Sequence, residues 1–422
     1  MILRCPIALL SLAFPAFADT WPAFRGPNGD GTSTARGLPM EWSETKNVTW
    51  KTPIPGRGWS TPVVSDSQVW LTTATEDGRE MSIYCLDRKT GAVLHQEVLY
   101  RNHNPEPLGN PVNGYASPSG FIEPGRVFLH FGSYGTACFD TATFKKIWER
   151  RDLPCRHYRG PGSSLFAYKS LLIVSMDGVD VQYLAALDKA TGKTAWKTDR
   201  TVDFKDLDQD GKPKQEGDMR KAYTTPILAT FPDGKQHLVS TGSKATYGYD
   251  PASGKELWFI TYDGFSNASS PVYADGLVFV NSGYGKANLY CVPVTSQSRG
   301  DLTSTCRWEQ TKRMPLRSSP VVTGGLVYLV TDDGQATALD IASGEPVWSE
   351  RLRGNFSASV LLAEGRLLFC GEQGNSSWVQ PGRTFTILAT NQLDTGLMAS
   401  PVAVDRELYL RTKTHVYRIE KK

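Results

Sequence analysis

Ser319-Pro320-Val321-Val322 begins the most complete copy of a repeat that specifies the fold of this chain. The copy continues as Val327-Tyr328-Leu329, Ala338-Leu339-Asp340, Ser343-Gly344 and Trp348. Its alternating apolar residues are typical of a half-buried strand, and its Ser-Gly pair is typical of a tight turn. Similar stretches recur at intervals of roughly 40 to 60 residues, which is the pattern of a β-propeller with about four strands in each blade. The sequence therefore predicts an all-β protein.

The first residues of the repeat, Ser-Pro or a similar pair, occur eight times and so predict eight blades. These pairs are Thr61-Pro62, Ser117-Pro118, Ser163-Ser164, Thr225-Pro226, Ser270-Pro271, Ser319-Pro320, Ala358-Ser359 and Ser400-Pro401. Most of them lead to a Leu-Asp-like pair and a Thr-Gly or Ser-Gly turn, and then to a strand that carries a tryptophan. Because an indole ring buries a large apolar area, we expect each of these tryptophans to pack one blade against the next.

The last repeat has room for only three strands, whereas Val48–Thr52 near the N-terminus supplies a Trp-bearing strand without a repeat of its own. Pairing the two would leave no free sheet edge. We therefore expect an eight-bladed β-propeller whose last blade is closed by an N-terminal strand. The expected domain organisation is a signal peptide at 1–18, an N-terminal extension at 19–47 and the propeller at 48–422.

The first residues predict export. Arg4 precedes an apolar run at Ile7–Phe14, and Ala16-Phe17-Ala18 fits a signal-peptidase cleavage site. After it, no stretch approaches the roughly 20 apolar residues of a transmembrane segment, so we expect a periplasmic or extracellular protein. The formal net charge is only +3, which argues against nucleic acid as a partner.

Six cysteines follow the expected signal peptide, and none forms a CxxC pair. Export permits disulfides. Cys291 and Cys306 are predicted to lie on neighbouring strands of one blade, so they are the pair that we expect to be bonded. The alternative is that they are buried, unpaired thiols, because cysteine often packs as a small apolar residue.

The Leu-Asp pair followed by Thr-Gly and Trp resembles the pyrrolo-quinoline quinone (PQQ) repeat of quinoprotein-like propellers. Trp21–Gly29, Gly56–Ser60 and His157–Gly162 also resemble an exported bacterial, BamB-like branch of that family. The resemblance implies the propeller fold but not one function, because the family includes quinoprotein alcohol dehydrogenases as well as BamB, a non-enzymatic lipoprotein of outer-membrane barrel assembly. A propeller hosts catalysis, binding and assembly alike.

The sequence departs from the dehydrogenases of this family. Those enzymes stack PQQ on a disulfide between adjacent cysteines, and no Cys-Cys pair exists here. The missing pair therefore argues against bound PQQ, although the fold still allows it. We expect a non-enzymatic binding or assembly scaffold. A PQQ-dependent oxidoreductase acting on alcohols or sugars is the alternative, and an enzyme acting on polysaccharide is a further one; no motif identifies catalytic residues.

Three consecutive joints between blades are long: His95 to Ser117, Trp148 to Ser163 and Trp196 to Thr225. Long loops on a rigid scaffold are where binding residues gather. The predicted site for a protein or a small polar or anionic ligand, on the loop-rich face around the central tunnel, consists of His103, Asn104, His157, Arg159, Arg57 and Arg317. The alternative is that these side chains satisfy one another and hold the loops in place.

The third long joint carries Asp206, Asp208 and Asp210 at alternate positions, followed by Gly211, which resembles the start of a calcium loop. The twelfth position, where such a loop needs a glutamate, is Gly217, and Glu216 stands beside it. Asp206, Asp208, Asp210 and Glu216 are therefore a candidate calcium site. The alternative is a solvated acidic loop.

Overall fold

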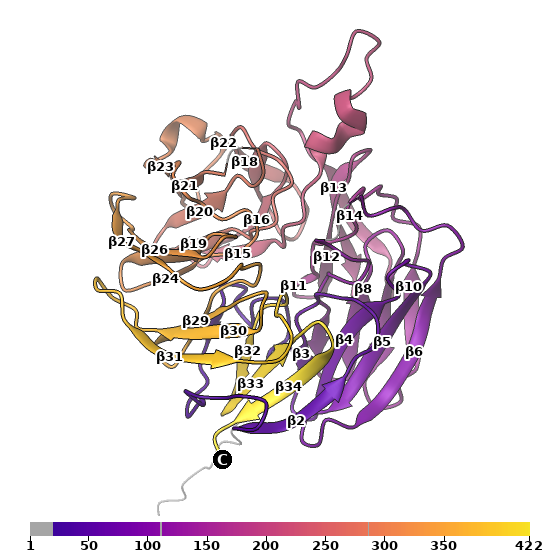
Figure 1. Ribbon diagram of the computed structural model, residues 1–422. Coiled ribbons are helices and arrows are strands. Elements are labelled where there is room, and N and C mark those ends of the chain that lie inside the picture. Colours follow the sequence, from indigo (N-terminus) through magenta and orange to yellow (C-terminus); the bar gives the residue numbers. More distant parts are fainter. Residues whose placement is uncertain (1–19, 110–111, 286) are drawn as a thin grey trace, which may run out of the picture.

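Eight sheets, each antiparallel within its blade, form a closed ring (Figure 1). The structure is a computed structural model, and it describes residues 20–109, 112–285 and 287–422. The expected signal peptide at 1–18 lies outside the described residues. The prediction of an eight-bladed β-propeller is confirmed.

Each blade has four strands, which follow one another from the innermost to the outermost. Blade 1 consists of β3 (Val63–Val64), β4 (Gln68–Ala74), β5 (Glu80–Asp87) and β6 (Val93–Arg101), and blade 2 of β7 (Phe121–Glu123), β8 (Arg126–His130), β9 (Thr136–Asp140) and β10 (Lys146–Arg150). Blade 3 consists of β11 (Phe166–Tyr168), β12 (Leu171–Asp177), β13 (Gln182–Asp188) and β14 (Thr194–Asp199), and blade 4 of β15 (Ile227–Thr230), β16 (Gln236–Thr241), β17 (Ala245–Tyr249) and β18 (Glu256–Thr261). Blade 5 consists of β19 (Val272–Ala274), β20 (Leu277–Asn281), β21 (Leu289–Pro293) and β23 (Trp308–Gln310), and blade 6 of β24 (Val321–Thr323), β25 (Leu326–Val330), β26 (Gln335–Asp340) and β27 (Pro346–Arg351). Blade 7 consists of β28 (Leu361–Ala363), β29 (Arg366–Cys370), β30 (Asn375–Val379) and β31 (Ile387–Gln392), and blade 8 of β32 (Val402–Val404), β33 (Glu407–Arg411), β34 (His415–Glu420) and β2 (Val48–Pro53).

Four further short elements lie outside this plan. β1 (Thr32–Ser33) pairs in parallel with β28 of blade 7, and β22 (Gly300–Asp301) pairs in parallel with β18 of blade 4. Two 3-10 helices, η1 (Lys214–Arg220) and η2 (Thr303–Thr305), lie in connections.

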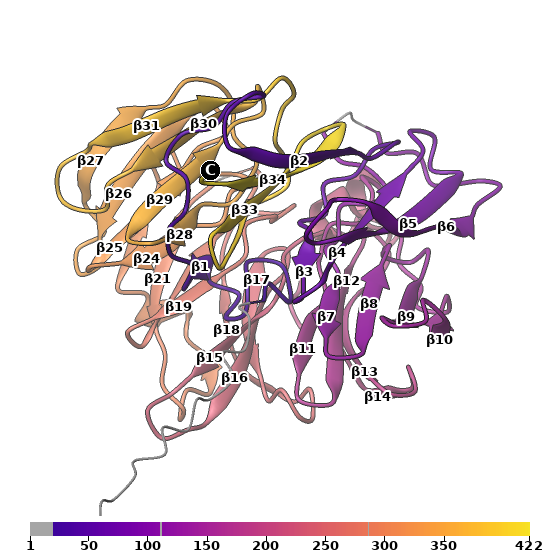
Figure 2. The same cartoon turned by 90° about the horizontal axis from the view of Figure 1, so that it is seen from below.

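The predicted ring closure is confirmed in blade 8. β2 pairs antiparallel with β34, from Val48 opposite Ile419 to Pro53 opposite His415. Figure 2 shows β2 beside β34, although the two strands come from opposite ends of the chain. The N-terminal strand thus covers an edge that would otherwise expose unpaired backbone groups.

The repeated Leu-Asp and Thr-Gly pairs build a turn between the two outer strands of a blade. Asp87 Oδ1 accepts hydrogen bonds from both the backbone N–H and the hydroxyl of Thr90, each at 2.7 Å. Asp188 and Thr191 repeat this pair of bonds in blade 3, at 2.9 and 2.8 Å. The aspartate is needed because its carboxylate satisfies turn groups that no strand partner reaches.

The glycine of this turn lies against the tryptophan of the preceding blade. Gly91 has φ of +73°, and a Cβ there would stand 2.6 Å from the Trp50 ring, so both the conformation and the space require glycine. The Trp50 indole N–H donates to the Arg88 carbonyl at 3.0 Å. Trp148 makes the same contacts with Gly192 and with the Lys189 carbonyl. The expected blade-to-blade role of the repeated tryptophans is confirmed at these positions.

Hydroxyl-bearing residues two positions before each innermost strand form a ring around the axis. We call them the hydroxyl collar: Thr61, Ser119, Ser164, Thr225, Ser270, Ser319, Ser359 and Ser400. From Thr61 to Ser400, the backbone N–H of each member donates to the hydroxyl oxygen of the next, at 2.8–3.2 Å. The Thr61 hydroxyl closes the ring by donating to the Ser400 carbonyl at 3.5 Å. The collar therefore links all eight blades at one level.

The collar corrects the predicted start of blade 2. Ser119 is the collar member there, and the predicted start Ser117-Pro118 lies two residues earlier. The Ser117 hydroxyl donates to the Asn113 side chain within the preceding joint instead. The Ser-Pro pair is misleading because in this blade it belongs to the joint and not to the strand.

Residues Trp21–Gly31, which we call the plug, lie inside the ring beyond the collar. Trp21 exchanges backbone hydrogen bonds of 2.8 and 2.9 Å with Val64 of blade 1, and the Pro22 carbonyl accepts from Ile122 of blade 2 at 2.8 Å. The Gly31 carbonyl accepts from Leu362 of blade 7 at 2.8 Å. In Figure 2 the N-terminal segment passes between β3 and β28 before it reaches β2. The expected N-terminal extension is therefore integrated into the propeller.

Arg25 holds the plug to the opposite side of the ring. Its side chain is 2% exposed, and its guanidinium donates to the Ser319 carbonyl at 3.2 Å and to the Pro320 and Asp30 carbonyls at 2.5 Å each. Burial lowers the pKa of Arg25 to about 10, which leaves it charged at neutral pH. The plug is thus anchored by a buried cation whose hydrogen bonds end on backbone oxygens.

Candidate functional site

A cavity of about 600 Å³ opens on the face that carries the long joints. Its floor includes four collar members, Ser164, Thr225, Ser359 and Ser400, together with Phe24 of the plug. Its walls come from joints around the ring: Trp59, Val112, Asn113, Ser117, Arg159, Gly162, Asp218, Lys221, Tyr223, Phe265, Ser266, Ala268, Tyr284, Leu316, Arg317, Asp332, Ser357 and Met398. A second cavity, of about 340 Å³, lies against the plug. Phe24 lines both cavities and so stands between them.

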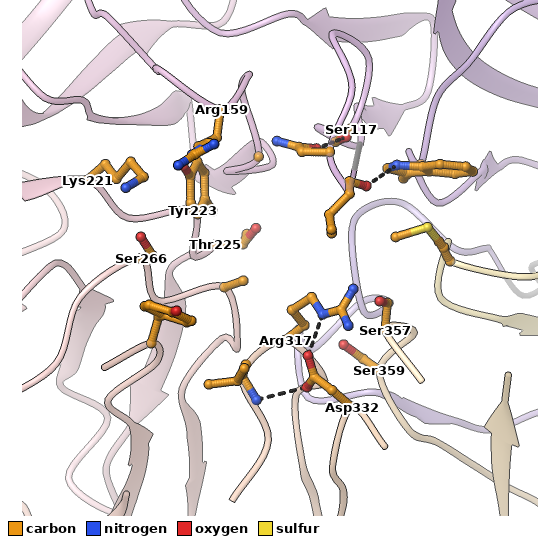
Figure 3. Close-up of a pocket in the computed structure, with 18 of the residues that line it drawn as sticks. Ser117, Arg159, Lys221, Tyr223, Thr225, Ser266, Arg317, Asp332, Ser357 and Ser359 are labelled. Atoms are coloured by element: carbon orange, nitrogen blue, oxygen red, sulfur yellow. Dashed lines mark hydrogen bonds and ion pairs between the residues drawn. The ribbon is translucent and has the colours of Figure 1, made fainter. Parts of the chain in front are cut away.

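Arg159, one of the predicted binding residues, lines the cavity (Figure 3). Its guanidinium lies over the ring of Tyr158, 4.8 Å from the centroid. Among the described residues, no carboxylate or hydrogen-bond acceptor pairs with this guanidinium. Arg159 is therefore a half-buried cation whose donors are available to a ligand.

Lys221 and Tyr223 lie on the same side of the cavity as Arg159 (Figure 3). Lys221 is 2% exposed, and its ammonium forms an ion pair with Asp218. Burial lowers the pKa of Lys221, and Asp218 opposes that shift. Burial likewise raises the pKa of Tyr223 well above its usual value, and its buried hydroxyl has no hydrogen-bond partner among the described residues. This corner therefore combines a neutralised cation, an available cation and an unsatisfied hydroxyl.

Arg317, also a predicted binding residue, lines the side of the cavity away from Lys221 (Figure 3). Its Nε donates to Asp332 at 2.5 Å, and one of its terminal nitrogens lies 3.2 Å from Glu372. The Ser357 hydroxyl also donates to Glu372. Arg317 is therefore paired with two carboxylates. Its positive charge is compensated, so it does not attract a further anion into the cavity.

His157 is brought close to the site but does not enter it. It is 5% exposed, its Nε2 accepts the backbone N–H of Ser133 at 3.0 Å, and its Nδ1 lies 3.6 Å from Cys155 Sγ. Burial lowers its pKa to about 4, so the ring is neutral at pH 7. His157 therefore holds the second long joint in place. This is the role that the sequence left open for it as the alternative to ligand binding.

The remaining predicted residues do not line the cavity. His103 and Asn104 are exposed on the first long joint. The Arg57 guanidinium lies 5.5 Å from the centre of the Trp59 ring, and Arg57 is half-buried. The cavity therefore brings together only Arg159 and Arg317 of the six predicted side chains: His103 and Asn104 are exposed, and His157 is buried in the second long joint.

The predicted calcium site is not assembled. Asp206 is 1% exposed and accepts two hydrogen bonds from Arg220, at 2.6 and 2.9 Å, while Asp208 Oδ1 accepts backbone N–H groups of Asp210 and Lys212. Glu216 is exposed and has φ of +55°. Within the described ranges, no three Asp, Glu, His or Cys residues are arranged to hold a metal ion. The buried ion pair occupies the first carboxylate that calcium would need.

The predicted disulfide is also absent from the structure. Cys291 and Cys306 do lie in the same blade, but both are free thiols. The register places Cys291 opposite Trp308, and the Cys306 thiol is 3.1 Å from the Trp308 carbonyl, to which it donates. The two-residue offset between Cys306 and the paired position explains the difference from the prediction.

Several residues of the cavity have no signal in the sequence. Lys221 and Tyr223 stand in no recognised motif, and Phe24 lies in the Trp21–Gly29 stretch, which indicates the family but not a place in the cavity. The collar could have been found, because its Ser/Thr residues stand at or next to the predicted blade starts, but their mutual hydrogen bonds and their place under the cavity follow only from ring closure.

Among the described residues, no helix is both long and apolar enough to cross a membrane.

The cavity does not fit PQQ as the quinoprotein dehydrogenases hold it. The described cysteines are all free and none is adjacent to another, so no vicinal disulfide can stack on the quinone. PQQ carries three carboxylates, but two of the three cations of the cavity are already neutralised by Asp218 and Asp332. The described residues also offer no three-ligand group for a calcium ion beside a quinone.

Solved structures with the same fold include both enzymes and assembly factors. A europium-containing methanol dehydrogenase aligns over 93% of this chain and 89% of its own, with a TM-score of 0.67 and 12% identity. BamB from Moraxella catarrhalis aligns over 88% of this chain and 99% of its own, with a TM-score of 0.59 and 12% identity. At this identity the likeness shows the fold alone.

Sequence comparisons identify the family. Residues 32–151 and 180–422 match a family model described as outer membrane protein assembly factor BamB. The outer membrane protein assembly factor BamB of Vibrio cholerae is 24% identical over 294 residues, which are 59% of this chain and 70% of that protein. The plug and most of the joint that carries Arg159 lie outside the matched residues. Through its repeats, its eight blades and a match over most of its length, this chain belongs to the PQQ-repeat propeller family described as outer membrane protein assembly factor BamB.

Proposed function

We propose that this protein is an exported, non-enzymatic binding or assembly scaffold that captures an anionic partner or ligand on the loop-rich face of the propeller. The observation that carries the proposal is the state of the charged groups in the cavity. Lys221 and Arg317 are each paired with a carboxylate, whereas Arg159 has none among the described residues. An uncompensated arginine in a walled cavity favours recognition of an anion.

The state of a nearby cysteine and histidine argues against nucleophilic catalysis. Such chemistry needs a nucleophile within reach of the ligand and a base that activates it. Cys155 and His157 are in contact but are buried and do not line the cavity, and burial raises the pKa of the thiol and lowers that of the imidazole to about 4. Both shifts favour the neutral, unreactive pair. Membership of a family described by an assembly factor also supports a scaffold.

The test compares retention of partners by three purified proteins. Parent, Arg159→Ala and Arg156→Ala proteins are immobilised and exposed to the cell-envelope and secreted fractions of the source organism. Arg156 is the matched control because it stands on the same joint, is exposed and does not line the cavity. We expect the Arg156→Ala protein to retain the same partner as the parent, and Arg159→Ala to lose it while melting at the parent temperature.

A second arm addresses the enzymatic alternative. Parent protein is mixed with PQQ and calcium, and dye reduction is followed with alcohols and sugars as substrates. We expect no turnover and no change in melting temperature. Stoichiometric quinone binding with turnover would show that the protein is an oxidoreductase and would overturn the proposal.

A further inference from the structure

We propose that the cavity binds a sugar that carries one carboxylate, with the carboxylate at Arg159 and the sugar oxygens over the hydroxyl collar. This inference rests on the proposed function, since it names the ligand class of the same site. Three independent features of the cavity lead to it: its balance of charge, its unused O–H donors and its aromatic walls.

One cation of the cavity remains available to an anionic group. Lys221 is bound to Asp218, and Arg317 to both Asp332 and Glu372, whereas Arg159 has no carboxylate partner among the described residues. A guanidinium presents parallel N–H donors that match the two oxygens of a carboxylate. Tyr223, whose buried hydroxyl lacks a partner, stands beside it (Figure 3). A single carboxylate therefore suits this corner better than a polyanion.

The floor of the cavity offers O–H donors without acceptors. Each of Ser164, Thr225, Ser359 and Ser400 uses its oxygen to accept a backbone N–H from the neighbouring blade. Each hydroxyl keeps one proton to donate, and no described residue accepts it. A buried donor without an acceptor is costly. The collar is thus adapted to a ligand, or to water that a ligand replaces, with several acceptor oxygens.

The walls add aromatic surface of a size that suits a small saccharide. Trp59 is fixed by a hydrogen bond from its indole N–H to the Val112 carbonyl at 3.0 Å. Phe265 and Tyr284 pack edge to face with centroids 5.5 Å apart, and Tyr284 is 58% exposed. Rings of this kind present flat apolar surface to the C–H groups of a sugar. The volume of about 600 Å³ lies within the range of small-molecule sites.

A sugar acid matches this lining better than a peptide does. Every peptide unit brings an N–H donor that needs an acceptor. The carboxylates that line the cavity, Asp218 and Asp332, are already engaged by Lys221 and Arg317. The lining is therefore rich in donors and poor in acceptors, which favours a ligand whose oxygens do most of the accepting.

The test is calorimetric titration with a matched pair of disaccharides, cellobiouronic acid and cellobiose, which differ at one carboxylate. Acetate, sulfate and a short peptide with a free C-terminus are titrated in parallel. We expect the parent to bind cellobiouronic acid at least tenfold more tightly than any of the others. Arg159→Ala should weaken binding of cellobiouronic acid at least tenfold and leave binding of cellobiose unchanged, and Arg156→Ala should bind both as the parent does. Ser359→Ala should weaken binding of both disaccharides to the same extent.

The outcomes that overturn the inference are distinct. Equal binding of the two disaccharides would remove the role of the carboxylate, and equal binding of acetate or sulfate would reduce the site to a simple anion site. Tighter binding of the peptide would identify a peptide site. Unaltered affinity in Arg159→Ala would place the ligand elsewhere. If no disaccharide binds but Arg159→Ala still loses the retained partner, this inference fails while the proposed function stands.

Discussion

The plug at Trp21–Gly31 and the third long joint between β14 and β15 are both irregular, polar segments whose residues suggest a special role. The plug lies inside the ring with Trp21, Arg25, Gly26 and Gly31 buried, and it is bonded to blades 1, 2, 6 and 7. The third joint extends away from the ring (Figure 1), and its acidic tip residues are exposed. Its main internal anchor is the ion pair between Asp206 and Arg220. The number of blades that a segment contacts, and not its motif, therefore determines whether the fold depends on it.

Removing the N-terminal segment should have the largest effect. Deleting residues 19–52 takes away the plug and β2, which leaves β34 without its outer partner. We expect a protein that aggregates or lacks a cooperative melting transition, because an open sheet edge and an unfilled ring are exposed together. Differential scanning calorimetry and light scattering measure both effects.

The matched deletion shortens the third joint. Leu207 and Pro213 form an isolated bridge, so residues 208–212 can be removed between paired positions. We expect this variant to melt within a few degrees of the parent, by the logic that exposed loop tips tolerate change. If the two deletions are equally harmful, the contrast between the plug and the third joint is wrong.

Arg25→Ala should be the most harmful single substitution in the plug. It leaves buried carbonyls without donors and opens a void, so we expect a loss of more than about 3 kcal/mol in the free energy of unfolding, as judged from urea denaturation. Arg36→Ala is the control, because Arg36 is exposed and, among the described residues, its guanidinium donates only to the neighbouring carbonyls of Thr34 and Ala35. A loss below about 1 kcal/mol for Arg25→Ala would show that the backbone bonds alone hold the plug.

The second long joint should contribute less to stability than the plug and more than the third joint. The contribution of His157 to it should appear as a dependence of stability on pH. The pKa of His157 is lowered from 6.5 to about 4 by burial. Below pH 6.5 the unfolded chain binds a proton that the native protein does not, so stability falls as the pH drops toward 4. The expected contribution is about 3 kcal/mol. Urea midpoints between pH 7 and 4 should change less in His157→Gln than in the parent. His103→Gln, at an exposed site, should follow the parent curve.

The smallest effects are expected in the third joint. Asp206→Asn breaks the buried ion pair with Arg220 and should cost about 2 kcal/mol. Asp208→Ala removes two local bonds at an exposed position and should cost about 0.5 kcal/mol or less. Neither variant nor the parent should change its melting temperature when calcium is exchanged for a chelator. Stabilisation of the parent by calcium that Asp208→Ala abolishes would restore the calcium site.

The architecture of this protein can be predicted from local patterns in its sequence. The recurring Ser/Thr start, the alternating strand, the Asp-capped turn and the outer-strand tryptophan encode the same local geometry in most blades. The Ser117-Pro118 start and Trp258, which bonds to His237 of its own blade, are exceptions. Counting them is enough to find eight blades, and the incomplete last repeat indicates that Val48–Thr52 closes the ring. These predictions succeed because strand period, turn chemistry and burial of an indole act between residues that are close in sequence or in neighbouring repeats.

The roles of the polar residues, in contrast, depend on the closed ring. His157 and Arg159 stand two positions apart on one joint, yet one is buried as a neutral pin and the other enters the cavity. The sequence suggests calcium for Asp206 because its partner Arg220, fourteen residues away, is not recognisable there. The collar, the plug and the cavity they delimit join residues from all parts of the chain. Their contacts exist only once eight blades close around one axis, since ring closure, and not the local sequence, sets which side chains meet.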